Sequence, residues 1–409
     1  MIDLLKCAFY RVFQVMFSLG ARMLPWRKAE MIQGKGSVCR VPELLRREKL
    51  KNPLVVTGPT LYQSGLTGKL TEILDREGIP YAVFHQVEAN PSIETVEAIA
   101  RFYTEHGCDG FIAFGGGSPI DAAKAAGARL AMPNKTIAQL GGLLKVHKPI
   151  PPLIAVPTTA GTGSETTIAA VITDTQTHHK YAIGDLHLIP LYAVLDPELT
   201  VGLPPHVTGA TGMDALTHAV EAYLCWTNNT RESRRAAEEA VIMIVQNLEQ
   251  AYGNAQNIRA RSNMLVASYL AGYAFTRAGV GNVHAIAHTL GGLYGTPHGL
   301  ANAVLLPIVL EDYGKAIHHK LARLAELTGI MPQGSREEKA AAFIREICAM
   351  NRRMSIPEHL NFIREEDVPQ MVRWALKEAN PTYPVPVVYT PQRCRGVIEA
   401  LRGIENARK

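Results

Sequence analysis

Cysteines are few in this sequence, and its excess of charge is small. The 409 residues include six cysteines and no C-x-x-C pair, so neither a disulfide framework nor a thiolate zinc site is indicated. We therefore expect a reducing, cytoplasmic compartment. The formal net charge is +5, from 42 Lys and Arg against 37 Asp and Glu. No basic run is interleaved with aromatic residues as a nucleic-acid groove requires, so we expect no nucleic-acid partner. The cysteines are Cys7, Cys39, Cys108, Cys225, Cys348 and Cys394.

Long uninterrupted apolar runs are missing too. The N-terminal segment is apolar, but Lys6, Arg11 and Arg22 interrupt it, so it falls short of the roughly 18 to 20 residues that span a bilayer. At about 100° per residue its apolar side chains share one arc, which predicts an amphipathic helical extension over residues 1–28. We favour packing of this helix on its own protein or on a partner subunit. Contact with a membrane surface through residues 1–26, or a transit role, is the alternative. The arc holds Ile2, Leu5, Phe9, Val12, Phe13, Met16, Phe17, Leu19, Met23 and Leu24.

The rest of the composition is that of a globular protein, with 47% hydrophobic and 19% charged residues. A chain of this length suits two domains. Over residues 29–203, β-rich runs alternate with helical spacing, which predicts a doubly wound dinucleotide-binding α/β domain. Residues 204–409 are helical in pattern, and the Pro- and Gly-rich stretch 203–212 marks the boundary. Predicted strands lie at 52–58 and 81–87 and within 109–118, 152–165 and 192–200; predicted helices include 214–224, 231–252, 258–275, 315–327 and 336–351.

An apolar strand runs directly into three glycines in the stretch FIAFGGGSPIDAAKAAG. Ser118 then stands at an N-cap position and Pro119 at the first helical position. Glycines let a backbone approach a ligand closely, and the open N–H groups of a helix start attract a pyrophosphate. The pattern predicts dinucleotide binding; a tight turn that needs glycine only for its backbone angles is the alternative. The glycines are Gly115, Gly116 and Gly117.

A second loop of small and hydroxyl-bearing residues, PTTAGTGSETT, follows the next predicted strand. Thr158, Thr159 and Ser164 can donate hydrogen bonds to a phosphate or a ribose. Loops at the ends of neighbouring parallel strands line one crevice. The two loops together are better evidence for a dinucleotide than either alone, although a polar loop without a ligand is the alternative reading.

Histidines are concentrated in one apolar stretch, VGNVHAIAHTLGGLYGTPHG, which contains His284, His288 and His298. Upstream, Asp214 and His218 are four residues apart and would project from one face of a helix. A carboxylate with several imidazoles suits a divalent first-row metal such as iron or zinc. A shell of four protein ligands would take Asp214, His218 and two of the three other histidines, and spacing alone does not separate His284 from His288. The remaining histidine could relay the proton that accompanies hydride transfer.

These motifs together resemble the iron-containing (group III, iron-activated) alcohol dehydrogenases over roughly residues 30–400. The resemblance implies a Rossmann-like α/β domain followed by an all-α domain, the dehydroquinate synthase-like fold of iron-type alcohol dehydrogenases. It also implies a metal-dependent, NAD(P)-linked alcohol dehydrogenase or aldehyde reductase, acting on a metal-bound primary alcohol or aldehyde. The shared stretches include GGGSPIDAAK, PTTAGTGSE, VLDPELT, TGMDALTHAVEAY, HAIAHTLGGLYGTPHGLANAVLLP and NPTYPVPV.

The resemblance further implies a role for each matching residue. His288 would be the histidine that assists proton transfer without binding the metal. Phe275 would lie near the substrate, Asn90 near the nicotinamide and Lys180 near its ribose. A homodimer or larger homo-oligomer is also implied. The ligands to Fe(II), or to zinc, would be Asp214, His218, His284 and His298; the other cofactor contacts would be Gly115, Gly116, Gly117, Ser118, Asp121, Thr158, Thr159 and Ser164.

Three positions depart from the family's pattern. Gly58 stands where many members carry an Asp that repels the 2′-phosphate of NADP, so we expect use of NADP as well as NAD. Ala169 replaces an Asn found in some members and would suit longer aliphatic aldehydes. Arg277, if it faced the substrate, would suit a carboxylate and favour a hydroxyacid dehydrogenase or a hydroxyacid-oxoacid transhydrogenase. For a long Arg side chain, however, solvent or a neighbouring acid is the more common environment.

Overall fold

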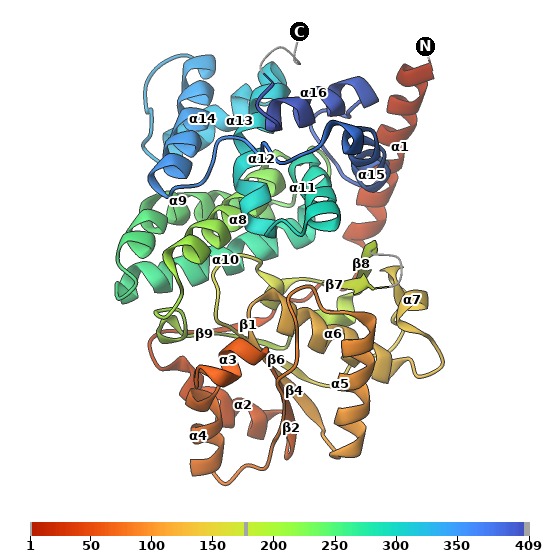
Figure 1. Ribbon diagram of the computed structural model, residues 1–409, viewed down its shortest axis with the longest axis vertical. Helices are drawn as coiled ribbons and strands as arrows, with labels where there is room; N and C mark the ends of the chain where they lie inside the picture. The colour runs from red at the N-terminus through yellow and green to blue at the C-terminus, as the bar shows by residue number, and fades with distance from the viewer. Residues whose placement is uncertain (1, 176–178, 405–409) are drawn as a thin grey trace. The chain divides into compact units, whose positions relative to one another are not determined.

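The computed structural model describes residues 2–175 and 179–404, drawn as a ribbon in Figure 1. Contacts between residues divide the chain into two compact units. The α/β unit comprises Pro25–Leu203 and Ala255–Gly272, and the helical unit comprises Met1–Leu24, Pro204–Asn254 and Tyr273–Lys409. The predicted fold class, an α/β domain followed by an all-α domain, is confirmed.

A six-stranded, all-parallel sheet forms the centre of the α/β unit, with strand order β1-β9-β6-β4-β2-β3. The five predicted strands are all in it. The edge strand β1 was not predicted, because only four residues pair and just one of them, Ile32, is buried. The bounds are β1 Glu30–Gln33, β2 Pro53–Val56, β3 Ala82–Phe84, β4 Gly110–Gly115, β6 Leu153–Pro157 and β9 Tyr192–Leu195.

Both faces of this sheet are buried, which is why its strands are continuous apolar runs and do not alternate with polar residues. In β2, Leu54 and Val56 pack in one core cluster and Val55 in the other, as the two-residue period of a strand dictates. Helices α5 and α6 supply the first cluster, and α2 and α4 the second. The helices of this unit are α2 Val41–Arg47, α3 Pro59–Gln63, α4 Gly68–Arg76, α5 Ile93–Glu105, α6 Gly117–Ala131 and α7 Ile137–Leu140.

A smaller sheet of three strands, in the order β5-β8-β7, was not predicted from the sequence. Strand β7 pairs antiparallel with β8 and carries Ala169 at its first position. Only alternate residues of β7, Ala170 and Ile172, are buried. The bounds are β5 Gly142–Leu143, β7 Ala169–Asp174 and β8 His179–Gly184.

The helical unit is built around α8, α11 and α12, whose residues are buried on most sides. Such helices are apolar nearly all round, as central helices of a bundle are. Within the described part of the chain, no helix is long and apolar enough to cross a membrane. The remaining helices, of which α10 begins in the α/β unit, are α1 Ile2–Arg22, α8 Pro205–Leu224, α9 Arg231–Gly253, α10 Ile258–Ala278, α11 Asn282–Tyr294, α12 His298–Tyr313, α13 His318–Leu327, α14 Arg336–Arg353, α15 Val368–Ala379 and α16 Pro391–Leu401.

The predicted division of the chain into 1–28, 29–203 and 204–409 differs in two places from the two units that contacts define. Contacts group helix α1 with the helical unit. Residues 255–272, which include the first part of α10, belong to the α/β unit. The reason for the second difference is packing: Leu265 and Tyr269 share a core cluster with Ala193 of β9, and the Tyr269 hydroxyl donates to the carbonyl of Ala29.

We expect Gly163→Ala to lower the thermal unfolding midpoint strongly. Gly163 has φ +59°, and a Cβ there would lie 2.6 Å from Cα of Gly272 in α10. The strain of a left-handed residue and the backbone clash together should cost about 3 kcal/mol or more. The control is Gly65→Ala, at φ +76° with nothing within 4 Å, which should lose only about 1–2 kcal/mol. Equal midpoints for the two variants in calorimetry would contradict a requirement for this close approach.

Candidate metal and cofactor site

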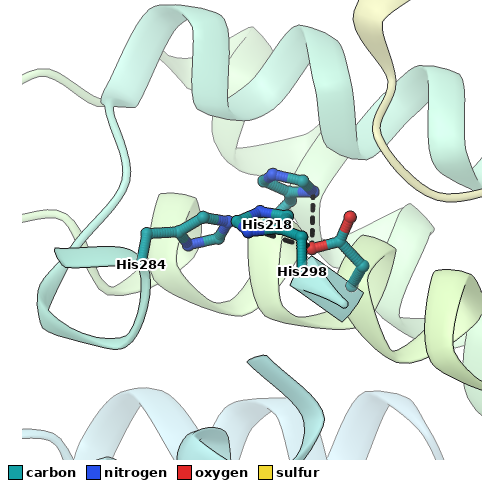
Figure 2. Close-up of side chains that lie close together, drawn as sticks. His218, His284 and His298 are labelled. Atoms are coloured by element: carbon teal, nitrogen blue, oxygen red, sulfur yellow. Dashed lines mark ion pairs between the residues drawn. The ribbon is translucent and has the colours of Figure 1, made fainter. Parts of the chain in front are cut away.

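Four predicted metal ligands lie together in the helical unit. Helix α8 places Asp214 and His218 one turn apart, α11 carries His284, and α12 begins at His298. Their ligand atoms all lie within 4.8 Å of one another, and Figure 2 shows the three imidazoles converging. The Asp214 carboxylate lies 3.6 Å from Nε2 of His298 and 4.0 Å from His218 and His284.

The donor set fits a divalent transition metal. Ligand atoms about 2.1 Å from a tetrahedral metal are about 3.4 Å apart, close to the separations of 3.6 and 4.0 Å here. Asp214, His218 and His284 are at most 5% exposed. Burial and the neighbouring histidines lower the pKa of His284 well below its ordinary value. Its imidazole is therefore neutral, as a metal ligand must be.

Glu221 positions His284. Its carboxylate accepts hydrogen bonds from the backbone N–H groups of Gly281 and Val283, at 2.8 Å each, and from Nδ1 of His284 at 2.6 Å. With its proton on Nδ1, His284 presents the lone pair of Nε2 to the cluster. Burial raises the pKa of Glu221 to about 7, although these hydrogen bonds favour its charged form. Glu221 was not among the predicted site residues, although it lies seven residues after Asp214, on the same face of α8.

Asn302 is a second buried polar residue at the cluster. Its amide Nδ2 lies 2.7 Å from Oδ1 of Asp214, 3.2 Å from Nε2 of His284 and 3.1 Å from Nε2 of His298. Asn302 is fully buried and lies one helical turn after His298 on α12. The amide can hold the Asp214 carboxylate in place. Asn302 was not among the predicted site residues, although its spacing of four residues from His298 places the two on one face of α12.

His288 is close to this cluster but faces a different partner. Its ring stacks on that of His298, with centroids 5.2 Å apart. Its Nδ1 lies 2.6 Å from Oε1 of Glu378, which also accepts a hydrogen bond from the Tyr383 hydroxyl at 2.7 Å. Burial acts to raise the pKa of Glu378, but the His288 charge and these hydrogen bonds outweigh it and hold that pKa below its ordinary value. No sequence signal joins Glu378 to His288, ninety positions earlier.

Two of the predicted substrate-pocket residues lie on α10 in the helical unit. The Phe275 ring stacks on that of His218, with centroids 4.2 Å apart. Arg277 is half-buried, and burial lowers its pKa while Tyr273 and Glu232 act to raise it. The Tyr273 hydroxyl donates to Glu232, so an acid of the chain itself lies in the electrostatic environment of Arg277. Ala169 belongs to the α/β unit.

The glycine-rich loop joins β4 to α6 in the α/β unit. Gly115 has φ +150°, and a Cβ there would lie 2.6 Å from Cγ of Pro119. Helix α6 starts at Gly117, with Gly116 rather than the predicted Ser118 at the N-cap, because the three glycines already allow the chain to turn. No side chain caps this helix. Its first N–H groups and the positive end of its dipole therefore remain available to an anion.

The second loop packs directly on the first. The N–H of Thr158 donates to the carbonyl of Gly115 at 3.0 Å. A Cβ at Gly116 would meet Oγ1 of Thr159 at 3.1 Å, and one at Gly117 would meet Cγ2 of Thr162 at 3.0 Å. The glycines are thus required by the contact between the two loops as well as by the turn itself.

Hydrogen bonds between α6 and the second loop hold the two loops together through Asp121, Lys124 and Ser164. The Ser164 hydroxyl donates to Asp121 at 2.6 Å, and Asp121 also accepts from the N–H of Val171. The Lys124 ammonium, fully buried, lies within 3.2 Å of five oxygens of Ser164, Thr167 and Ala169. The polar groups of Asp121 and Ser164 are engaged inside the protein. Lys124 was not among the predicted site residues, although a lysine in an alanine-rich helical segment is unusual enough to indicate a buried role.

Three other predicted cofactor residues form a chain of hydrogen bonds that ends at Ser118 in the first turn of α6. The Lys180 ammonium donates to Oδ1 of Asn90 at 2.7 Å, and the N–H of Asn90 donates to the Ser118 hydroxyl at 3.4 Å. Asn90 adopts φ +60°, an uncommon conformation for a residue other than glycine. Gly58 follows β2 at the N-cap of α3, and a Cβ there would lie 3.0 Å from the carbonyl oxygen of Val87.

The sequence model of the iron-containing alcohol dehydrogenases matches residues 28–197, and that of the family's C-terminal part matches residues 208–400. The chain belongs to the iron-containing alcohol dehydrogenase family. It is an oxidoreductase, an iron-type, NAD-linked alcohol dehydrogenase or aldehyde reductase. The resemblance inferred from the motifs is thereby confirmed.

Among the members of the iron-containing alcohol dehydrogenase family, lactaldehyde reductase of Escherichia coli (strain K12) is 36% identical over 351 residues, 84% of this chain and 91% of that protein. A crystal structure of 1,3-propanediol oxidoreductase is similar with a TM-score of 0.88 and 36% identity, covering 93% of this chain and 100% of the other. Sulfoacetaldehyde reductase from Bifidobacterium kashiwanohense, in complex with NAD+, has a TM-score of 0.83 and 28% identity, covering 94% and 100%.

We expect Glu221→Gln to weaken metal binding by this alcohol dehydrogenase. An amide cannot accept from two backbone N–H groups and from His284 at once, so the imidazole loses its fixed tautomer. Loss of such a partner typically lowers metal affinity about 10- to 100-fold. The measurement is metal affinity by competition with a chelator. Glu366→Gln, at a residue whose side chain is 70% exposed, is the control. Unchanged affinity in a folded Glu221→Gln protein would show that the carboxylate is dispensable.

Proposed function

We propose that this protein interconverts small primary alcohols and aldehydes with a nicotinamide dinucleotide and a divalent metal held by Asp214, His218, His284 and His298. The observation that carries the proposal is the convergence of one carboxylate and three imidazoles in a largely buried cluster. Iron is the metal that the family's name implies, and zinc suits the same donors. A bound metal would act as a Lewis acid that polarises the carbonyl oxygen of an aldehyde and favours the alkoxide of an alcohol.

The chain's own residues prepare this cluster for a cation. Glu221 fixes the tautomer of His284, and Asn302 donates to the Asp214 carboxylate. Burial keeps His284 neutral, so no proton competes for its lone pair. Phe275 covers one face of the His218 ring and excludes water from that side.

His288 is the residue to which we assign proton transfer. Glu378 accepts from its Nδ1, which leaves Nε2 to exchange a proton with the substrate oxygen. The negative charge of Glu378 stabilises the imidazolium that forms when His288 takes up a proton, and Tyr383 holds Glu378 in place. These contacts support a relay from substrate to His288.

The nicotinamide cofactor would place its pyrophosphate at the start of α6. The uncapped N–H groups beyond Gly116, with the Ser118 hydroxyl, are the donors that support this placement. Thr158 and Thr159 border the same loop, while Asp121 and Ser164 set its shape. Lys180 and Asn90 would contact the nicotinamide-side ribose and the nicotinamide.

Small aldehydes and alcohols are the substrate class that the relatives' names support, since these name lactaldehyde, 1,3-propanediol and sulfoacetaldehyde. Ala169 offers a small apolar side chain that would suit longer aliphatic aldehydes. The alternative, a hydroxyacid dehydrogenase or a hydroxyacid-oxoacid transhydrogenase, would apply if the half-buried Arg277 faced the substrate. A homodimer or larger homo-oligomer in the cytoplasm is the assembly and location that we propose.

The proposal is tested by anaerobic purification, metal analysis and an aldehyde panel assayed with NADH and NADPH. We expect reduction that depends on Fe(II) or another divalent metal and that falls at least about 100-fold in His284→Ala, because one metal ligand is lost. His319→Ala, at an exposed histidine, is the control and should retain activity. A folded, metal-loaded protein that reduces no aldehyde and oxidises no alcohol would overturn the proposal.

Gly58 is expected to determine how well NADP is accepted. In Gly58→Asp a carboxylate would repel the 2′-phosphate, so the ratio of kcat/KM for NADPH to that for NADH should fall about tenfold or more. Gly58→Asn is the matched control, since it adds nearly the same volume beside the Val87 carbonyl without the charge. Equal ratios in the two variants would mean that crowding, and not repulsion, governs the choice of cofactor.

A further inference from the structure

Helix α1 packs on the helical unit through its polar side. Gln14 and Ser18 are at most 5% exposed. The Gln14 amide donates to the carbonyl of Tyr383 at 2.8 Å and accepts from Nε1 of Trp226 at 2.7 Å. The Arg11 guanidinium lies over the Trp226 ring and donates to the carbonyls at 385 and 386. In Figure 1 the red helix α1 runs along one edge of this unit.

The opposite side of α1 is apolar and faces outward. An amphipathic helix on a globular protein normally buries its apolar stripe, so the orientation here is the reverse. At about 100° per residue the outward side chains occupy an arc of about 120°. We call this arc the apolar face of α1. It comprises Leu5 at 67% exposure, Phe9 at 61%, Val12 at 63%, Val15 at 41%, Met16 at 63%, Leu19 at 51% and Met23 at 87%.

Basic residues flank the apolar face and outnumber the acids of the helix. Helix α1 contains three basic residues, Lys6, Arg11 and Arg22, and one acid, Asp3, in its first turn. Lys6 and Arg22 are exposed and lie on opposite flanks of the arc. An apolar face with a basic border is complementary to a surface that is apolar within and negatively charged at its rim, which is the boundary of an anionic lipid layer.

We propose that the apolar face of α1 binds the surface of an anionic membrane, with the helix lying in the plane of the headgroups. Phe9, Met16 and Leu19 enter the boundary between headgroups and acyl chains, while Lys6 and Arg22 contact lipid phosphates. The polar side of α1 stays attached to the helical unit, so the enzyme is held at the membrane by its own surface without a spanning segment.

A second copy of this chain is the rival occupant. Leu5, Phe9 and Val12 recur at intervals of four and three residues, and the pattern continues to Met23, which is also the spacing of a coiled-coil seam. Two paired copies of α1 would, however, each carry three basic residues and one acid, so the excess positive charge on both helices would oppose the pairing. Charge therefore favours lipid over self-association.

The test is flotation of the full-length, metal-loaded protein with vesicles of phosphatidylcholine alone or mixed with phosphatidylglycerol. We expect binding to the anionic vesicles only. The partition coefficient should fall roughly fivefold for each of Lys6→Gln and Arg22→Gln and at least about tenfold for Met16→Glu, which puts an acid in the apolar face. Phe362→Glu is the matched control, since Phe362 is 49% exposed elsewhere on the helical unit and should bind as the unmodified protein does.

Light scattering and circular dichroism on the same variants separate the remaining outcomes. Failure to bind either vesicle, with a lower molar mass for Met16→Glu, would assign the face to a second copy and overturn the proposal. Failure of the unmodified protein to bind either vesicle, with the same molar mass for Met16→Glu as for the unmodified protein, would overturn the proposal too. Equal binding to neutral vesicles would refute the role of anionic lipid, and equal binding of Met16→Glu and Phe362→Glu would refute the role of α1.

Discussion

The Glu221 carboxylate, buried between two helices, is the contact on which the metal cluster depends. It accepts hydrogen bonds from the N–H groups at the start of α11 and from His284. The same carboxylate therefore joins α8 to α11 and fixes the orientation of the His284 imidazole. Gly281 must be glycine for this contact, since a Cβ there would lie 2.6 Å from Glu221. A buried carboxylate is costly unless it is fully hydrogen-bonded. A folded helical unit therefore has His284 already oriented before any cation arrives.

A buried cation plays the corresponding part in the α/β unit. Lys124 stands on α6, the helix whose open N-terminus is the candidate pyrophosphate site, and its ammonium binds backbone and hydroxyl oxygens of the neighbouring loop. Burial lowers the pKa of Lys124 to about 8, while Asp121 and Glu165 act to raise it. Each of the two candidate sites is thus supported by a buried ionisable group that hydrogen-bonds to residues proposed to contact the ligand.

The sequence predicted much of this fold because the signals involved are local. Strands buried on both faces are short apolar runs, glycines with special backbone angles stand next to them, and Asp214 and His218 share a helix face by spacing alone. Edge and half-exposed strands such as β1 and β7 carry no such signal. The choice between His284 and His288 could not be made from spacing, because it depends on Glu221 and Glu378, which approach from other helices. The side of α1 that packs inward was equally hidden, since periodicity separates two faces without saying which one the protein covers.

The attachment of α1 has a consequence for how this part of the chain can change over evolution. Its acceptors at 383, 385 and 386 are main-chain carbonyls, which every amino acid carries. Pro384 and Pro386 have no N–H groups, so their stretch cannot form a regular helix or sheet, and its carbonyls remain open to side chains from elsewhere. The side chains of the receiving segment take no part in these three hydrogen bonds, whereas the side chains of Arg11 and Gln14 do. This contact therefore constrains the sequence of the helix's polar side more than the sequence of the segment that receives it.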